Sequence, residues 1–554
     1  MCSYTKFLFF FRIYEYNKRM EIFQSILELF GGLAIFIYGV HILSEGLEKV
    51  AGSKLLSFLD RSLDHPLKQG LFGTVATALM QSSGLLMVTM IGLINTNMLS
   101  LQQAIGIMLG QEIGTTITGQ LVSFQIKGFN LIFLIIGFFL MFFSKDRKLR
   151  MIGQPFFGFG TIFVGMNMMS KAGGVISQTT FFQEALLVMG QYTLLGVLVG
   201  ALFTALVQSS TAMTGLVIAM GISHGITLEV AIAIILGANI GSCIMGWMAA
   251  LQSGSSAKRA SYAQIFINII GVLLFLPFIN PYTNFISTTS SVLSRQIANA
   301  HTVFNICVSV LMLPFIKPLA SFVEKLIPEQ EEEKTKKSKT RFIDPRLLNM
   351  PMMAVKLAKE EVLRMGEITC EMVEKASQAM LHKNKDDVKW VFKHEKDVDE
   401  ITRTLEGFLE SIPGDKLNPT DQDTLEDLKH LITDIERVGD HANNLAEYAS
   451  EIADNKIDIS KDAKKELKTI SGLVIHNYQA SLKALKTENK KMISKIAKRE
   501  DEIDTLEKKF RQNHIERLKK KICHPEADTI FNDTLRNLER ISDHAYNIAL
   551  SLEK

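Results

Sequence analysis

Apolar and polar positions divide this chain into two unlike halves. Between residues 21 and 320 charged side chains are few, and apolar stretches recur like membrane segments, near 28–44, 129–143, 186–207, 228–250 and 265–280. Several of these stretches are shorter than the roughly 20 residues that a straight spanning helix needs, so some are expected to be re-entrant. The alternative is a large soluble protein with buried core helices, but so many apolar runs are hard to bury in water.

From Pro328 onward the continuous apolar runs disappear, and apolar residues recur at three- and four-residue steps. This helical pattern includes Val388, Val391 and Val398, and it stops at Pro413. Amphipathic helices with short connectors form bundles. We therefore predict an all-α chain in four parts. These parts are an N-terminal extension (1–24), a polytopic membrane domain (25–320), a charged linker (321–350) and a helical bundle domain (351–554).

The membrane half contains an internal duplication with an offset of 127 residues. Residues 77–84 (TALMQSSG) return as 204–211 (TALVQSST), and residues 110–116 (GQEIGTT) return as 237–243 (GANIGSC). Polar, glycine-flanked breaks at matching places of two hydrophobic repeats are typical of a transporter's binding site. We predict two repeats of inverted orientation, at about 28–143 and 156–280. Each repeat is expected to contain a re-entrant hairpin, at about 64–96 and 186–222.

Three basic clusters indicate the orientation of the chain. They are found at residues 145–150, 258–259 and 334–341, and all three are expected to be cytoplasmic. This predicts a multi-pass protein of the plasma membrane, surrounded by lipid, with its C-terminal domain in the cytoplasm. The five cysteines are scattered and form no CxxC pair, which fits a reducing compartment.

Each Gln-Ser-Ser motif offers hydroxyls, an amide and backbone N–H groups where a helix is expected to break. A helix N-terminus with serine hydroxyls suits an anion, and amide and backbone carbonyls can coordinate Na⁺. No Lys or Arg occurs in residues 72–126 or 185–257, so a bound anion would need co-bound cations. Small polar residues in membrane helices often serve packing alone, but the matched duplication favours binding.

The second motif of the first repeat adds a carboxylate. Glu112 lies inside this motif and is a candidate cation ligand. We match its neighbour Gln111 with Asn239 of the second repeat.

Together these motifs resemble type II sodium/phosphate cotransporters, in particular their bacterial relatives, over about residues 25–318. The resemblance implies sodium-coupled symport of inorganic phosphate by alternating access, with Na⁺ as the coupling ion. It implies a substrate and sodium site at Gln81, Ser82, Ser83, Gln111, Thr115, Gln208, Ser209, Ser210, Thr211 and Asn239. The sequence departs from the family at Gly84, where a third serine is common, and at Gln111, where an asparagine is expected.

The charged half is duplicated as well, which predicts a pair of three-helix bundles. Residues 435–444 (IERVGDHANN) match 538–547 (LERISDHAYN), and residues 395–399 (EKDVD) match 500–504 (EDEID). Glu-x-x-x-Asp spacing puts two carboxylates on one helix face, and two such pairs on adjacent helices make an oxygen-rich cation site. The candidate ligands are Glu395, Asp399, Glu436, Asp440, Glu500, Asp504, Glu539 and Asp543, with His441 or His544 as further candidates. The alternative is a solvated acidic face with ordinary salt bridges.

These bundle motifs resemble PhoU-type domains over about residues 350–554. The resemblance implies a regulator of phosphate uptake with divalent or iron-type metal sites, and as partners a second copy of the chain or a regulatory protein. No Walker A loop, His-Glu-x-x-His motif or nucleophile triad is visible, so we do not expect an enzyme. Basic residues of the bundle are mixed with acids, so nucleic-acid binding is not expected. Two alternative functions are a membrane phosphate-status sensor and an exporter of phosphate or another oxyanion.

Overall fold

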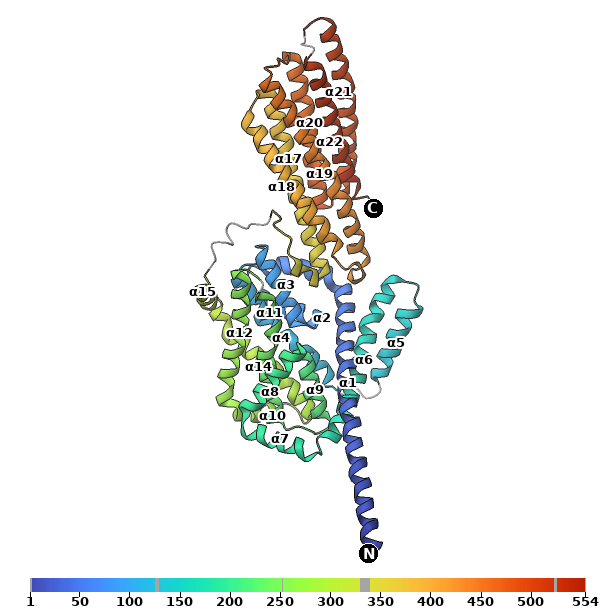
Figure 1. Ribbon diagram of the computed structural model, residues 1–554, viewed down its shortest axis with the longest axis vertical. Coiled ribbons are helices and arrows are strands. Elements are labelled where there is room, and N and C mark those ends of the chain that lie inside the picture. The colour runs from blue at the N-terminus through green and yellow to red at the C-terminus, as the bar shows by residue number, and fades with distance from the viewer. Residues whose placement is uncertain (1, 125–128, 252, 329–338, 523–525, 554) are drawn as a thin grey trace. The chain divides into compact units, whose positions relative to one another are not determined.

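The computed structural model describes residues 2–124, 129–251, 253–328, 339–522 and 526–553 (Figure 1). Within these ranges every regular element is a helix, which confirms the predicted all-α fold class. The chain forms two compact units, residues 1–336 and 337–554, and each is described by itself. Of the predicted linker 321–350, residues 329–338 lie outside the described residues.

Unit 1 holds the apolar half of the chain. Its helices are α1 (Cys2–Ser62), α2 (Pro66–Met80), α3 (Ser83–Asn95), α4 (Leu101–Val122), α5 (Phe129–Phe143), α6 (Arg147–Ile176), α7 (Thr180–Gln191), α8 (Thr193–Val207), α9 (Ser210–Ile222), α10 (Leu228–Ser242), α11 (Ile244–Leu251), α12 (Ser255–Phe275), η1 (Leu276–Phe278), α13 (Ile279–Ser287), α14 (Leu293–Met312), η2 (Leu313–Phe315) and α15 (Ile316–Leu326). The predicted extension 1–24 is not a separate element, because α1 is continuous from Cys2. Helix α15 likewise continues the membrane half to Leu326, beyond the predicted boundary.

Several helices of unit 1 are long and apolar enough to cross a membrane. Four helical stretches meet this criterion within the described residues: Lys18–Ala51, Leu228–Leu251, Ser255–Ser287 and Leu293–Leu326. A fifth is the pair α7 and α8, which bends by 114° at its break. The second hairpin therefore begins at Thr193 rather than near 186, because α7 buries none of its residues and turns away.

The two 127-residue repeats each contain a pair of closely packed parallel helices, α2 with α4 and α8 with α10. A Cβ atom on Gly110 of α4 would overlap the carbonyl oxygen of Gly70 in α2, so the two helices touch through their backbones. The equivalent Gly237 of α10 packs in the same way on Val197 of α8. Small residues allow such close approach inside a membrane. The two repeats thus build the same pair of parallel helices.

The two hairpins enter unit 1 from opposite ends, as an inverted repeat requires (Figure 1). Thr214 of α9 packs on Gly119 near the end of α4, and Gly221 in the last turn of α9 lies beside Ser294. Ser294 in turn bonds the carbonyl oxygen of Ser123, just after α4, so α9 runs parallel to α4. Helix α2 also runs parallel to α4. The open end of the first hairpin, where its two helices are not joined, therefore lies beside the start of α4, and the open end of the second hairpin lies beside the end of α4.

A further duplication, of 37 residues, relates the last helices of unit 1. Helices α12 and α14 each run into a short 3-10 turn with the sequence Leu-Pro-Phe, residues 276–278 and 313–315, and each turn leads into a further helix. The proline explains the irregular turn, because it removes a donor and disfavours an uninterrupted α-helix. The polar residues at equivalent places of α12 and α14 become important at the site.

Unit 2 consists of two three-helix bundles in sequence. The helical elements are η3 (Pro345–Asn349), α17 (Pro351–His382), α18 (Lys385–Glu410), η4 (Gly414–Lys416), α19 (Pro419–Asp454), α20 (Lys461–Thr487), η5 (Lys490–Met492), α21 (Ile493–Lys519) and α22 (Glu526–Leu550). Helix α19 begins as its sequence predicts, with Pro419 in the first turn and the Asn418 side chain accepting a bond from the N–H of Asp421. Apolar side chains of each helix face the bundle interior, which is the core of this unit.

Candidate functional site

Each Gln-Ser-Ser motif breaks its helix in the same backbone conformation. Gln81 ends α2 with φ 53° and ψ 16°, and Gln208 ends α8 with φ 58° and ψ 26°, the left-handed region that often terminates helices. Ser82 and Ser209 are extended and act as N-caps. Their hydroxyls accept bonds from the N–H of Leu85 (3.2 Å) and of Ala212 (3.1 Å). At each break the chain therefore reverses within two residues, and a new helix begins there.

A small space between the two breaks is here named the hairpin cavity. Its lining residues are Gln81, Ser82, Ser83, Gly84, Gln208, Ser209, Ser210, Thr211, Ser242 and Met245. None of them carries a formal charge, and the first residues of α3 and α9 both belong to this lining. The volume is about 20 Å³, close to the room that one water molecule needs. All seven predicted Gln-Ser-Ser-(Thr) residues therefore meet around one small polar space.

The missing third serine of the first motif has a packing explanation. A Cβ atom on Gly84 would overlap the Sδ atom of Met245, which comes from α11 of the second repeat. Met245 also lines the hairpin cavity. The first Gln-Ser-Ser motif thus contributes one hydroxyl fewer than the second, because a methionine occupies that place.

The predicted residues of the second motifs lie outside the lining of the hairpin cavity. Gln111, Thr115 and Asn239 are buried in α4 and α10, and none is among the lining residues. The Thr115 hydroxyl donates to the carbonyl oxygen of Gln111 at 3.1 Å within its own helix. Ser242, which sequence reasoning missed, does line the cavity, and it is the equivalent of Thr115 at an offset of 127 residues.

Our match of Gln111 with Asn239 is wrong. At the offset of 127 residues Gln111 corresponds to Ala238, and the partner of Asn239 is Glu112. The packing agrees, because Gly110 and Gly237 occupy the same place against α2 and α8. The first repeat therefore carries a carboxylate where the second carries an amide.

Glu112 and Asn239 each contact a polar pair on a neighbouring helix. Glu112 Oε1 accepts bonds from Gln264 Nε2 (3.1 Å) and Asn268 Nδ2 (3.2 Å) of α12. Asn239 bonds through Oδ1 to His301 Nε2 (3.1 Å) and donates through Nδ2 to Asn305 Oδ1 (3.1 Å), both on α14. The two pairs are equivalent in the 37-residue duplication. Sequence reasoning missed this arrangement, although the repeated Leu-Pro-Phe turns could have indicated it.

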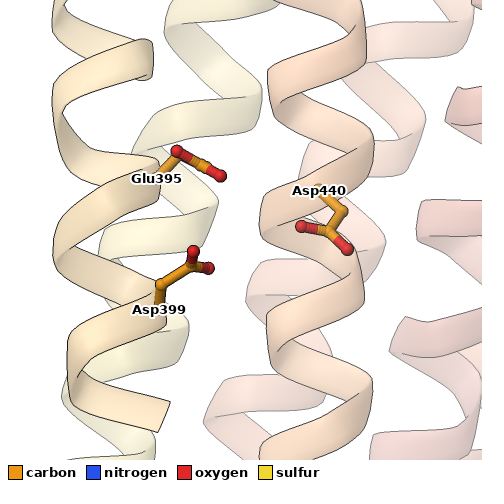
Figure 2. A group of neighbouring side chains, drawn as sticks. All are labelled: Glu395, Asp399 and Asp440. Carbon is orange, nitrogen blue, oxygen red and sulfur yellow. The ribbon is translucent and has the colours of Figure 1, made fainter. Parts of the chain in front are cut away.

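In unit 2, carboxylates from two helices gather in each bundle. Glu395 and Asp399 of α18 meet Asp440 of α19, with one ligand atom from each within 4.8 Å of the others (Figure 2). The second bundle repeats the group with Glu500, Asp504 and Asp543, from α21 and α22. Three oxygen donors in such a group suit a hard divalent cation or iron.

The fourth predicted carboxylate of each bundle lies near its group but outside the set of three. Burial, followed by the charges of Asp440 and Asp399, raises the pKa of Glu436. Burial and the neighbouring Asp543 likewise raise the pKa of Glu539. Burial, followed by the charges of Asp399 and Asp440, also raises the pKa of Glu395. A bound cation would relieve this mutual repulsion, so the donor set fits a metal.

The two histidines make their hydrogen bonds across to the other bundle. His441 Nδ1 bonds Asn537 Oδ1 of the other bundle at 2.8 Å, and His544 Nδ1 bonds Asp434 Oδ1 at 2.9 Å. Their rings stack with centroids 5.7 Å apart. Both side chains therefore connect the bundles to each other, and neither belongs to the groups of three carboxylates.

The fold and the hairpin cavity define an integral membrane protein of the transporter class, with paired helix breaks and an attached helical bundle unit. A family model for the Na⁺/Pi-cotransporter matches residues 35–171 and 177–293, and a PhoU domain model matches residues 362–449 and 467–552. The chain belongs to the Na⁺/Pi-cotransporter family and carries PhoU domains. Each model matches twice, in keeping with the two internal duplications.

Similar proteins come from bacteria and from animals. The Salmonella typhimurium protein named "Putative inorganic phosphate export protein YjbB" is 23% identical over 533 residues, covering 95% of this chain and 97% of the relative. The Bacillus subtilis protein YqeW is 31% identical over 272 residues, covering 49% of this chain and 88% of YqeW. The human Sodium-dependent phosphate transport protein 2B is 32% identical over 148 residues, covering 26% of this chain and 21% of that protein. The solved structure of PhoU from Pseudomonas aeruginosa aligns with 36% of this chain and 95% of its own, at 20% identity and a TM-score of 0.35.

Proposed function

We propose that this protein moves inorganic phosphate across the cell membrane in symport with Na⁺, by alternating access. The observation that carries the proposal is the pair of helix breaks that enter from opposite ends and line one polar cavity. A site shared by two inverted hairpins can open to either side without being rebuilt. The names of the relatives, one an exporter and one sodium-dependent, point to the same substrate.

The chemistry of the hairpin cavity suits an anion that arrives with cations. Two helix N-termini and several hydroxyls supply N–H and O–H donors to phosphate oxygens. None of the lining residues is cationic, so dipoles alone would face a dianion at low dielectric. Co-bound Na⁺ supplies the missing positive charge, with amide and backbone oxygens as ligands. The proposed ligands are Gln81, Ser82, Ser83, Gln208, Ser209, Ser210 and Thr211. Three further residues, Gln111, Thr115 and Asn239, are buried outside the lining and would position the helices that carry the ligands.

Export is the second candidate, and one observation favours it. The relative that covers 95% of this chain bears the name of an export protein, whereas the sodium-dependent relative covers 26%. Alternating access works in both directions, and the ion gradient decides which one is used. Direction is therefore a property to measure together with coupling.

The bundle unit is proposed as a cytoplasmic regulator. The basic residues at 258–259 begin α12, and the Arg259 side chain donates to the carbonyl oxygen of Ile327, after α15, at 2.8 Å. The chain therefore leaves unit 1 at a basic end, which the positive-inside rule assigns to the cytoplasm. Metal bound to the two carboxylate groups, or a partner such as a second copy or a regulatory protein, would change the balance between transport states.

Uptake of labelled phosphate into proteoliposomes tests the proposal. An inward Na⁺ gradient is compared with K⁺ and with a pH gradient, for wild type, Ser209→Ala and the control Ser223→Ala. Ser209 caps α9 at the cavity, whereas Ser223 bonds Met220 O at the far end of the same helix (3.0 Å). We expect Na⁺-dependent uptake that falls at least about tenfold in Ser209→Ala, roughly 1.4 kcal/mol, and stays near wild type in Ser223→Ala.

Two other results would change the conclusion. Efflux from loaded vesicles that outpaces uptake under every gradient would support export. Phosphate binding without flux in either direction would argue against transport and support a phosphate-status sensor.

A further inference from the structure

Glu112 is a buried carboxylate in the middle of the apolar unit. Its side chain is 5% exposed, and it accepts hydrogen bonds from the two neutral amides of Gln264 and Asn268. Among the described residues no Lys, Arg or His forms an ion pair with it. An ionised group at membrane depth is costly without a partner, and it marks a functional site by default.

The equivalent position in the second repeat shows that the fold itself does not require this charge. Asn239 occupies the same place against α8, and its neutral amide hydrogen-bonds both of its neighbours, His301 through Nε2 and Asn305 through Oδ1. The backbone packing around the two positions is the same. The carboxylate is therefore a feature of the first repeat alone, and it needs an explanation of its own.

Unpartnered polar atoms lie beside Glu112. Gln264 is 1% exposed, and its Oε1 has no hydrogen-bond partner, although its Nε2 donates to Glu112. Gln111, next in the chain, is fully buried, and neither atom of its amide has a partner. Buried polar groups are rarely left without partners. An amide can also turn over to present its oxygen in place of its nitrogen.

We propose that Glu112 and the side-chain oxygen of Gln264 bind one Na⁺, at a site that only the first repeat possesses. One carboxylate balances one monovalent charge, so the ion removes the electrostatic cost without leaving an excess. The inference rests on the proposed transport function and deepens it. This Na⁺ is bound by a fixed protein charge, separately from any Na⁺ that accompanies phosphate in the hairpin cavity.

The site has a consequence for the transport cycle. When its Na⁺ leaves, a buried carboxylate remains between α4 and α12 without a counter-ion, and water must enter to solvate it. Na⁺ binding at Glu112 therefore favours the packed arrangement of α4 on α12 even before phosphate arrives. In the second repeat, with Asn239, the packing of α10 on α14 has no such requirement.

The test measures thermal unfolding of the full-length protein in detergent without phosphate, while Na⁺ replaces choline at constant ionic strength. An ion that binds only the folded state raises the melting temperature as its concentration rises. We expect wild type to show this rise and Glu112→Gln to lose it. Glu229→Gln, which removes an exposed carboxylate of the same unit, should keep the wild-type rise.

A second variant protects the test against misfolding of the first. Gln264→Leu removes the unpartnered oxygen but keeps the carboxylate, and it should raise the Na⁺ concentration for half the effect at least about tenfold. An unchanged Na⁺ response in either variant would overturn the proposal. A wild-type melting temperature that ignores Na⁺ but rises with acid would also overturn it, because a proton would then fill the site. Since phosphate is absent, these failures are distinct from a failure of phosphate transport.

Discussion

The two duplicated regions of this chain differ in which features their repeats share. In unit 1 the repeats share their backbone: Gln81 and Gln208 take nearly the same left-handed angles, and Ser82 and Ser209 nearly the same extended ones. Their side-chain partners have diverged, as Gly84 and Thr211 illustrate. In unit 2 the repeats share their side chains, because each bundle gathers the same three carboxylates.

The difference follows from what each medium demands. A helix break inside a membrane leaves backbone N–H and C=O groups without partners, so its geometry is tightly constrained. A group of carboxylates in the bundle unit lies on intact helices, and its constraint is the spacing of the ligands. Substitutions that disturb the backbone should therefore damage unit 1 most, and substitutions that remove single side chains should be felt most clearly in unit 2.

The largest effect is expected from Gly237→Ala. The added Cβ would overlap the carbonyl oxygen of Val197, and two packed helices cannot separate without strain of about 3 kcal/mol or more. We expect loss of monodisperse protein after purification, as measured by size-exclusion chromatography. Gly190→Ala is the control, because its Cβ would meet its nearest neighbour, Val230, at 4.0 Å. Equal yields of the two variants would contradict the close-packing argument.

The next effect concerns a single side chain in unit 2. Asp440→Asn removes one of three carboxylates of the first group, so affinity for Mn²⁺ at that site should fall at least about tenfold, or 1.4 kcal/mol. Manganese binding to the full-length protein, followed by calorimetry, measures the change. Glu426→Gln, which affects an exposed ion pair with Lys429 on the same helix, should leave the affinity unchanged.

The pH dependence without metal follows from the same carboxylates. Burial, together with neighbouring charges, raises the pKa of Glu395, Glu436 and Asp440 in the folded state. A group whose pKa is higher when folded binds protons more tightly in that state. The free energy of unfolding should therefore rise as pH falls from above the raised pKa values to the ordinary carboxylate value of about 4.

Fluorescence can isolate this response in unit 2. The chain has two tryptophans, so Trp247→Phe leaves Trp390 of α18 as the only reporter. Denaturant unfolding with chelator, near neutral pH and near pH 5, gives the change. Stability that falls with acid over this range would contradict the repulsion that the raised pKa values describe.

The smallest effect is expected from Gly84→Ala. Its Cβ would overlap the end of the flexible Met245 side chain, which can move at a cost of about 1 kcal/mol. A small fall in melting temperature should result, and adding Met245→Ala should remove it. A loss as large as that of Gly237→Ala would show that the side chains of unit 1 are as constrained as its backbone.

Sequence reasoning reached the fold class and the two hairpin breaks because both depend on local signals. Apolar runs, a Gln-Ser-Ser break and Glu-x-x-x-Asp spacing can each be read over a few residues. Our reading of 186–207 as one apolar segment missed the bend of 114° between α7 and α8, although Gln191 and Thr193 interrupt the apolar run at that point.

Partners between distant elements were harder to predict. The contact of Glu112 with Gln264 joins residues that are 152 positions apart, and no local sequence pattern predicts it. The wrong match of Gln111 with Asn239 compared residue types rather than the offset, and so hid the carboxylate-for-amide exchange. Met245 explains Gly84 only once α11 is known to pack against α3.

The bond from Arg259 to the carbonyl oxygen of Ile327 has a mechanical meaning. It fastens the last described turn of unit 1 to the first turns of α12, and the same helix carries Gln264 and Asn268. From Arg259 to Asn268 is nine residues, or about 14 Å along a rigid rod at roughly 1.5 Å per residue. A force on the chain where it leaves unit 1 would therefore act on α12, the helix whose amides bond the carboxylate of Glu112.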